Sequence, residues 1–529
     1  MNINNVVILS EAKDLLLAAN SRSFASLRMT IYFSGAELQE CPRYTYDLLL
    51  SIEKLIYGGD GLARTPPGAD GRSMAVFVPF VLPGERIEAE IRQEKPGFAR
   101  GSVTQLIEAS PDRVEARCPY FRQCGGCHYQ HIPYERQLEF KAGILRETLQ
   151  RIAKMEIKIE PKSGIRLHAS PPWNYRNRTR LQVQTAPEFP PQPGKTGRSG
   201  GPGFPPQPAK SARSGGPGFA LGYFRFGSHE FLPVGECPIS SPLLNRVMTR
   251  LLELGGLNCP AAVEEIELFA DAADERLLAW TFCGRETDKN DLLRWAEAIE
   301  RELPEISGVT FFFSRRRSSE HRSSEHRSSQ GRLEDDAPMD LQALAQSGAK
   351  SIRYRTKNHE YQVSAGAFFQ VNRYLVDELV SVVTGNARGD VALDLYAGVG
   401  LFSVALARNF HHIFAVEASL TSYADFVQNV PANVKAAGAR TEDYLRSRPV
   451  RKRPDLVVLD PPRTGAGKAV IRSLVELGAP RVRYVSCDPA TLARDIAPLL
   501  AAGYHIEEAH LFDLFPETFH IESVMLLAR

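Results

Sequence analysis

From Val391 onward, short apolar runs alternate with stretches of helical character, and this alternation constrains the fold more than any other feature. VALDLYAGVG is an apolar run that ends in a glycine-containing turn, and LFSVALARNF after it has the pattern of a helix. The apolar pattern recurs three times, in HIFAVEAS, DLVVLDPP and VRYVSCDP. Strands that alternate with helices form a parallel, doubly wound sheet, which binds ligands beyond the carboxyl ends of its strands. The carboxyl-terminal part is therefore predicted to be a Rossmann-like α/β domain.

Residues 47–110 have a different pattern, in which short β-type runs are separated by turns rich in glycine and proline. The runs are LLLSIEKLI, MAVFVPFVL, RIEAEIRQ and GSVTQLIEA. Several short strands in so few residues predict a small β-barrel, with an oligonucleotide-binding fold as the leading candidate. The chain is thus expected to be an α/β multidomain protein with a β-barrel at its amino-terminal end.

The remaining segments complete the predicted domain organisation. Residues 1–46 have no strong period and are interpreted as a disordered extension, residues 111–360 as a central domain, and residues 361–529 as the Rossmann-like domain. Two repeats interrupt the central domain, at 189–218 and 314–332. Neither repeat has enough apolar side chains to offset the entropy lost on ordering, so both are predicted to be mobile loops.

Composition argues against two classes of protein for this chain, namely disulfide-rich secreted proteins and membrane-spanning proteins. The 529 residues have a formal net charge of +2, which neither demands nor excludes a nucleic-acid partner. The eight cysteines are too few and too uneven for a secreted disulfide framework. The amino-terminal segment is a poor secretion signal, and no apolar run reaches the roughly 20 residues of a membrane span. We expect a cytoplasmic protein with reduced thiols and no membrane partner.

Three of the cysteines are crowded into one short segment. Cys118, Cys124 and Cys127 place three thiolate ligands within ten residues, and two glycines let the backbone wrap around a common point. Cys237, which also precedes proline in a turn, is the natural fourth ligand. Four thiolates suit zinc or an iron–sulfur cluster, and three close cysteines plus a distant one favour the cluster. Unligated, buried cysteines are the alternative.

The glycine turn after the first apolar run has the features of a methyl-donor site. Glycines in Asp394-Leu-Tyr-Ala-Gly-Val-Gly400 allow the backbone to approach a ligand, and Glu417 ends the next strand, where it can accept hydrogen bonds from ribose hydroxyls. The pattern is also compatible with a nicotinamide dinucleotide. The third glycine of the dinucleotide fingerprint is missing, so S-adenosylmethionine is favoured.

Two further strand ends carry residues that suit nucleophilic catalysis. Asp460-Pro-Pro-Arg463 ends one strand, and Ser486-Cys487-Asp488-Pro489 ends the next. A cysteine there either packs or acts as a nucleophile. Carbon 5 of uracil reacts poorly until a nucleophile such as a thiolate adds to carbon 6, and a base must later remove the proton from carbon 5. Glu522, in HIESVMLLA, is the candidate base; a solvent-facing glutamate on an edge strand is the alternative.

One further segment has the alternation of an RNA-facing strand. Arg176, Arg178 and Arg180 fall on one face, as a row of guanidinium groups suited to phosphates. Tyr175 and Leu181 fall on the other face, toward a core, together with Val183. A merely solvated strand is the alternative.

From about residue 50 to its end, the chain resembles the bacterial RNA uracil-C5 methyltransferases, and is most similar to the iron–sulfur branch that modifies 23S rRNA. IEKLIYGGDGLAR with FVPFVLPGERIEAEI resembles the TRAM barrel, an RNA-binding module, and CPYFRQCGGCHYQHIPYERQLEFK resembles the segment that holds the family's cluster. Two positions depart from the family's pattern. Ala397 stands where many relatives have cysteine, and His128 replaces a frequent glutamine, but neither change removes a ligand or a catalytic group.

The resemblance implies a role for ten residues. A [4Fe-4S] cluster would be held by Cys118, Cys124, Cys127 and Cys237; S-adenosylmethionine would be bound by Gln370, Tyr396, Glu417 and Asp460; the nucleophile and the proton acceptor would be Cys487 and Glu522. The implied reaction is transfer of a methyl group to carbon 5 of a uridine in 23S rRNA by a monomeric enzyme. Transfer RNA is the alternative substrate. A non-catalytic RNA-binding or ribosome-assembly protein, and a redox role for the cluster, are the rival functions.

Overall fold

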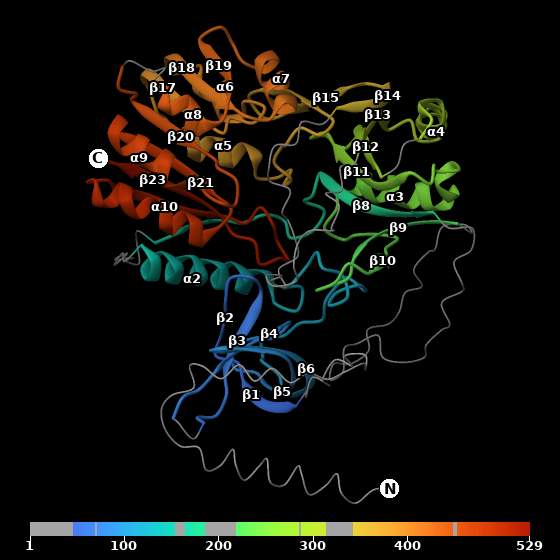
Figure 1. Ribbon diagram of the computed structural model, residues 1–529, viewed down its shortest axis with the longest axis vertical. Coiled ribbons are helices and arrows are strands. Elements are labelled where there is room, and N and C mark those ends of the chain that lie inside the picture. Colours follow the sequence, from blue (N-terminus) through green and yellow to red (C-terminus); the bar gives the residue numbers. More distant parts are fainter. Residues whose placement is uncertain are drawn as a thin grey trace, which may run out of the picture. The chain divides into compact units, whose positions relative to one another are not determined.

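The computed structural model describes residues 46–68, 71–153, 164–185, 218–284, 287–313, 342–447 and 452–529 (Figure 1). The predicted extension and the two predicted repeat loops fall outside these ranges, apart from Tyr46 and Gly218 at their ends. The description below concerns the unit Thr45–Arg529.

The amino-terminal part is a six-stranded sheet in the order β1-β5-β6-β4-β3-β2. Its strands are β1 (Asp47–Ser51), β2 (Lys54–Leu55), β3 (Asp60–Arg64), β4 (Ala75–Pro79), β5 (Arg86–Lys95) and β6 (Phe98–Glu108). Alternate side chains of β4 and β5 are buried, as the period-two pattern predicted. The sequence pattern missed β3, because DGLAR contains only one large apolar residue.

The central part is a seven-stranded sheet in the order β10-β9-β8-β11-β12-β13-β14, followed by a hairpin. Trp280 and its neighbours on β12 are buried on both faces of this sheet, which explains an apolar run without alternation. The elements are β8 (Arg178–Thr185), β9 (Phe219–Phe224), β10 (Phe231–Pro233), α3 (Pro242–Glu253), the 3₁₀ helix Gly255–Leu257, β11 (Val263–Ala270), β12 (Leu277–Cys283), α4 (Lys289–Glu302), β13 (Ile306–Phe313), β14 (Ala343–Gly348), and the hairpin β15 (Ser351–Arg355) and β16 (Glu360–Ser364).

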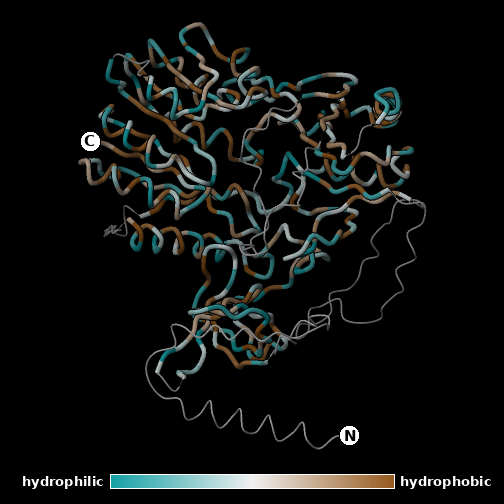
Figure 2. Tube along the Cα trace, viewed as in Figure 1, coloured by the Kyte–Doolittle hydropathy of each residue, from teal (hydrophilic) through white to brown (hydrophobic). Residues whose placement is uncertain are grey.

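The carboxyl-terminal part is an eight-stranded sheet in the order β19-β18-β17-β20-β21-β23-β22-β7. Strands β17 to β21 are parallel, as predicted, whereas β23 runs antiparallel to both of its neighbours. Hydrophobic residues concentrate in the central strands (Figure 2). The elements are α5 (Val376–Thr384), β17 (Gly389–Leu395), α6 (Leu401–Leu406), β18 (Phe410–Glu417), α7 (Leu420–Asn429), β19 (Val434–Gly438), α8 (Thr441–Arg446), β20 (Leu456–Leu459), α9 (Gly467–Leu477), β21 (Arg481–Ser486), α10 (Pro489–Ala501), β22 (His505–Phe512) and β23 (Glu522–Ala528).

Two segments of the predicted central domain belong to this α/β unit instead. Strand β7 (Arg166–His168) pairs in parallel with β22 at the edge of the sheet. Helix α2 (Tyr134–Ile152) packs against α10, and its Leu145 and Leu149 join the core beneath β20 and β21. The described part of residues 111–360 is therefore divided between the central part and the α/β unit. Among the helices of the described residues, none is both long and apolar enough to cross a bilayer.

Candidate active site

The residues predicted from separate strand ends meet at one edge of the carboxyl-terminal sheet. Tyr396, Glu417, Asp460 and Cys487 stand at or just beyond the carboxyl ends of β17, β18, β20 and β21, which run in parallel. Glu522 begins β23, which runs the other way, so it lies at the same edge. Parallel sheets bind ligands at this edge. The topology therefore gathers the predicted catalytic and donor-binding residues.

The turn after β17 is held in an unusual backbone conformation. Tyr396 has a φ of 63°, which is rare for a residue with a side chain, and Gly398 and Gly400 have φ values of 57° and 92°. A Cβ atom on Gly400 would lie 2.7 Å from the ring of Phe426, so only glycine fits there. A Cβ atom on Gly398 would meet no atom within 4 Å, which leaves space beside the turn.

Glu417 fixes this turn. One carboxylate oxygen accepts a hydrogen bond from the backbone N–H of Gly398 at 2.8 Å, and the other accepts from the N–H of Ser419 at 2.6 Å. Each carboxylate oxygen can accept a second hydrogen bond. Glu417 can therefore hold the turn and still accept hydrogen bonds from ligand hydroxyls.

Three carboxyl groups lie at this edge: Asp394 and Glu522 are buried, and Asp460 is half-buried. Burial raises the pKa of Asp394 to about 7, with a further increase from the charge of Asp460, against the opposing effect of the hydroxyl of Ser403. Burial also raises the pKa of Asp460 to about 7. The pKa of Glu522 is raised well above its usual value by burial and by Asp460, while Arg463 opposes the shift. These groups bind protons more strongly than ordinary carboxylates.

The pairing of β21 and β23 brings Cys487 and Glu522 to the same end of two neighbouring strands. Ser486 of β21 pairs with Ser523 of β23, and extending this antiparallel register by one residue places Cys487 opposite Glu522. The hydroxyl of Ser523 donates to the carbonyl of Ser486 at 3.2 Å. Glu522 is 6% exposed, and β23 lies between β21 and β22. The alternative of a solvent-facing glutamate on an edge strand is therefore wrong.

Tyr57, in the turn between β2 and β3, is a neighbour of the predicted nucleophile Cys487 that the sequence did not indicate. Its hydroxyl donates to the backbone carbonyl of Cys487 at 3.2 Å, and its ring meets the edge of Phe519 with centroids 5.7 Å apart. The contact joins residues 430 positions apart, so no local pattern signals it. The turn between β2 and β3 thus contacts the loop that contains Cys487.

Gln370 lies on a loop that the central sheet positions. The side-chain amide of Asn177 donates to the carbonyl of Gln370 at 3.1 Å. The backbone N–H of Asn177 donates to the carbonyl of Val371 at 3.0 Å. Phe369, next to Gln370, belongs to the same hydrophobic core as Val399 of the glycine turn. These contacts bring the loop toward the predicted donor site.

Comparisons with known proteins agree with this arrangement. The family profile described as tRNA (Uracil-5-)-methyltransferase matches residues 344–439 and 451–529, and the TRAM-domain profile matches residues 42–104. A 23S rRNA (uracil(1939)-C(5))-methyltransferase of Chromohalobacter salexigens is 31% identical over 491 residues, which cover 91% of this chain and 89% of that protein.

The chain belongs to the RNA uracil-C5 methyltransferases. An RNA methyltransferase of Halalkalibacterium halodurans that is otherwise uncharacterized is 29% identical over 92% of this chain. The solved structure of a Pyrococcus abyssi tRNA (uracil-54, C5)-methyltransferase in complex with S-adenosyl-L-homocysteine has the same fold, with a TM-score of 0.60, 22% identity and coverage of 90% of this chain and 99% of that one. The predicted resemblance is confirmed: this is an S-adenosylmethionine-dependent RNA-modifying enzyme with an amino-terminal TRAM domain.

In this methyltransferase, two arginines of the predicted RNA-facing row are paired with a carboxylate of the protein itself. Arg178 is 13% exposed and its Nε lies 2.5 Å from a carboxylate oxygen of buried Glu267, while Arg180 lies 2.9 Å from the other oxygen. The guanidinium of Arg178 also stacks over the ring of Trp280. Glu267, on the neighbouring strand β11, thus binds both side chains, while the side chain of Arg180 stays 39% exposed, and contact of the row with RNA stays a prediction. The predicted inward face is confirmed for Tyr175 and Leu181, which are buried.

The four predicted cluster cysteines of the methyltransferase are brought together. Burial raises the pKa of Cys118, Cys124 and Cys127, and the charge of Cys237 contributes to the increase at each of them, so the four thiols are neighbours. Cys118, Cys127 and Cys237 also share a small hydrophobic cluster. None of the four is in a disulfide.

Grouping alone does not make a metal site. Within the described ranges, no group of three or more His, Cys, Asp or Glu side chains has the arrangement needed to hold a metal ion. A cluster of several iron atoms spaces its thiolates more widely than a single ion does, because each sulfur binds a different iron. The set of four soft thiols suits such a cluster in chemistry, and the cluster stays a prediction.

Proposed function

We propose that this enzyme transfers a methyl group from S-adenosylmethionine to carbon 5 of a uridine in 23S rRNA, through a covalent bond between Cys487 and carbon 6 of the uracil. The proposal is supported by the register of β21 and β23, which, continued by one residue, puts Cys487 opposite the buried Glu522 at the sheet edge that also holds the glycine turn. The preference for 23S rRNA rests on the relatives at 31% and 30% identity, whose names state that substrate.

The proposed reaction needs a nucleophile and a base on the same side of the site. The thiolate of Cys487 adds to carbon 6, and the electrons of the ring double bond move to carbon 5 and carbon 4 oxygen, giving an enolate. Carbon 5 then bonds to the donor's methyl carbon, and the sulfonium leaves as a neutral thioether. Glu522 next takes the proton from carbon 5, the ring double bond reforms, and Cys487 leaves as a thiolate.

The raised pKa of Glu522 suits the second half of this reaction. A carboxylate of ordinary pKa is a weak base, whereas one raised by burial and by Asp460 binds the carbon 5 proton more strongly. Gln370, Tyr396, Glu417 and Asp460 would bind the methyl donor, and the open space beside Gly398 supports that placement.

Cys118, Cys124, Cys127 and Cys237 would hold a [4Fe-4S] cluster, which would supply a covalent cross-link between two distant segments of the chain. The segment 118–127 and the turn at Cys237 already lie together, so the link would reinforce an existing contact.

Two variants test the covalent mechanism. Cys487→Ala should abolish turnover while the protein still binds RNA and the methyl donor. Glu522→Gln should form a methylated adduct that cannot release its RNA, which denaturing electrophoresis and intact-mass spectrometry detect. Turnover by Cys487→Ala would refute the nucleophile, and free RNA without an adduct in Glu522→Gln would refute the base. Separate reactions with 23S rRNA and tRNA distinguish the two substrates.

A further inference from the structure

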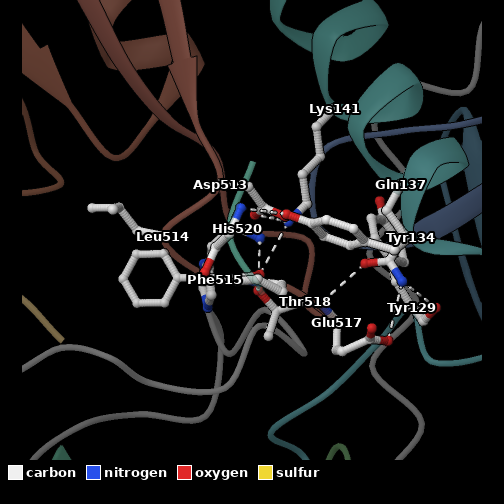
Figure 3. Close-up of polar contacts among 12 residues, drawn as sticks. Tyr129, Tyr134, Gln137, Lys141, Asp513, Leu514, Phe515, Glu517, Thr518 and His520 are labelled. Carbon is white, nitrogen blue, oxygen red and sulfur yellow. Dashed lines mark hydrogen bonds and ion pairs between the residues drawn. The ribbon is translucent and has the colours of Figure 1, made fainter. Parts of the chain in front are cut away.

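We propose that Gln137 and Lys141 of helix α2 are positioning residues for the base. They bind the loop 513–520, which leads directly into Glu522. They therefore act on proton removal rather than on methyl transfer. The inference rests on the proposed function of Glu522. It concerns polar contacts that cross between segments about 370 positions apart in the sequence (Figure 3).

Gln137 and Glu517 form a reciprocal pair. The side-chain amide nitrogen of Gln137 donates to a carboxylate oxygen of Glu517 at 3.1 Å, and the backbone N–H of Glu517 donates to the amide oxygen of Gln137 at 3.0 Å. The same amide nitrogen lies within hydrogen-bond distance of the carbonyls of Tyr129 and Ile132. Both partners of the pair are buried. Gln137 therefore fixes the side chain and the backbone of Glu517 at once.

The backbone of Glu517 is held in a conformation that it would not adopt freely. Its φ is 66°, in the left-handed region that favours glycine. Its carbonyl accepts hydrogen bonds from the backbone N–H groups of His128 and Tyr129, at 2.9 and 3.0 Å. Such a conformation persists only when surrounding contacts impose it. The segment that contains the cysteines and the start of α2 supplies those contacts.

Lys141 holds the first half of the same loop, one helical turn beyond Gln137. Its ammonium group lies 2.6 Å from a carboxylate oxygen of Asp513 and donates to the carbonyl of Phe515 at 3.0 Å. The Lys141 and Asp513 side chains have no exposed surface. The spacing of four residues places Lys141 and Gln137 on one face of α2, so a single helix contacts both the start and the middle of the loop.

Local hydrogen bonds couple the position of the loop to the position of Glu522. The hydroxyl of Thr518 donates to the carbonyl of Phe515 at 2.8 Å and accepts from the backbone N–H of His520 at 3.2 Å. Two residues after His520, Glu522 enters β23. A shift of the loop would therefore move the carboxylate of Glu522 relative to carbon 5, while Cys487, which lies between the end of β21 and the start of α10, would stay in place.

Because Glu522 would move with the loop and Cys487 would not, a shift of the loop should slow one step of the reaction and not the other. Formation of the adduct and methyl transfer depend on Cys487 and the donor turn, whereas release depends on Glu522. A misplacement of about 1 Å costs a catalytic step on the order of 100-fold. Removing the contacts between α2 and the loop should therefore slow release of the methylated RNA from Cys487 by about 10- to 100-fold. The formation of S-adenosylhomocysteine in a single turnover should stay within about twofold of wild type.

The test compares three variants of the full-length enzyme with Glu522→Gln as the reference for a trapped adduct. Gln137→Met removes the two hydrogen bonds between Gln137 and Glu517. Glu517→Gly removes the carboxylate yet suits the left-handed backbone, so it should fold even where Gln137→Met does not. Glu517→Gln keeps an oxygen that accepts from Gln137 and should behave like wild type. The first two should accumulate methylated covalent adduct, with kcat lowered and KM for RNA little changed.

Asp455→Ala is the matched control. Asp455 accepts two backbone hydrogen bonds, from Asp390 and Val391. It lies at the amino ends of β17 and β20, away from the loop, so its loss destabilises the domain without affecting the loop. It should accumulate no adduct. If Glu522→Gln traps adduct but neither Gln137→Met nor Glu517→Gly does, the inference is wrong and the proposed function stands. If Glu522→Gln itself traps none, the proposed mechanism and the inference both fail.

Discussion

Replacing Lys141 by methionine should be among the most destabilising single changes in the α/β unit. The ammonium of Lys141 and the carboxylate of Asp513 are 2.6 Å apart, and neither side chain has exposed surface. Removing one partner of a buried ion pair leaves the other charge without compensation and costs about 3–5 kcal/mol. The variant also leaves the carbonyl of Phe515 without its Lys141 donor.

Native-state hydrogen exchange is the appropriate assay, because a multidomain chain has no single free energy of unfolding. Peptides that cover β22, β23 and the loop between them should lose protection by roughly 100- to 5,000-fold in Lys141→Met, since each 1.4 kcal/mol is about a factor of ten. Peptides from the amino-terminal sheet should change little. The double variant Lys141→Met with Asp513→Leu should recover most of the loss, because it removes both charges. A loss below about fivefold in the single variant, or no recovery in the double one, would refute the assignment of a buried pair.

Three further predictions concern the site. Tyr57→Phe removes a hydrogen bond to Cys487, worth about 0.5–1.5 kcal/mol, and should lower kcat by about 2- to 13-fold without weakening donor binding in calorimetry; an unchanged kcat would contradict a positioning role. Asn177→Ala should weaken donor binding by about tenfold, because Gln370 loses its anchor, and an unchanged donor affinity would refute that link. Burial raises the pKa of Asp394 to about 7, so its protonation stabilises the fold fully below about pH 4 and this stabilisation disappears as the pH rises through 7; thermal melts should show a smaller decline in Asp394→Asn than in wild type, because Asp460, whose pKa is also raised to about 7, remains, and an equal decline would contradict the assignment.

The sequence predicted the elements whose side chains repeat with a clear period. The alternation after Val391 located β17, β18, β20 and β21, and the rule that ligands bind at their carboxyl ends led to Asp460 and Cys487. It did not reveal that β23 runs antiparallel, which is what brings Glu522 to the same edge. That orientation depends on the pairing of distant strands, and a local pattern does not contain it.

Contacts between distant segments account for the remaining differences. The alternation of Arg178 and Arg180 was real, but a carboxylate on β11 binds both, because Glu267 is far away in the sequence and adjacent in the sheet. Helix α2 was assigned with the central segment, yet its apolar face packs on the α/β unit. Gln137 and Tyr57 were likewise invisible, since each contacts a loop several hundred residues later.

The most direct test of the central claim is nucleoside mass spectrometry of RNA that lacks its natural methylations, after incubation with the anaerobically purified enzyme and isotopically labelled S-adenosylmethionine. The account predicts labelled 5-methyluridine in 23S rRNA with the wild-type enzyme, none with Cys487→Ala, and none in tRNA. Labelled 5-methyluridine in tRNA alone would contradict the proposed substrate, and its absence from both RNAs would contradict the proposed function.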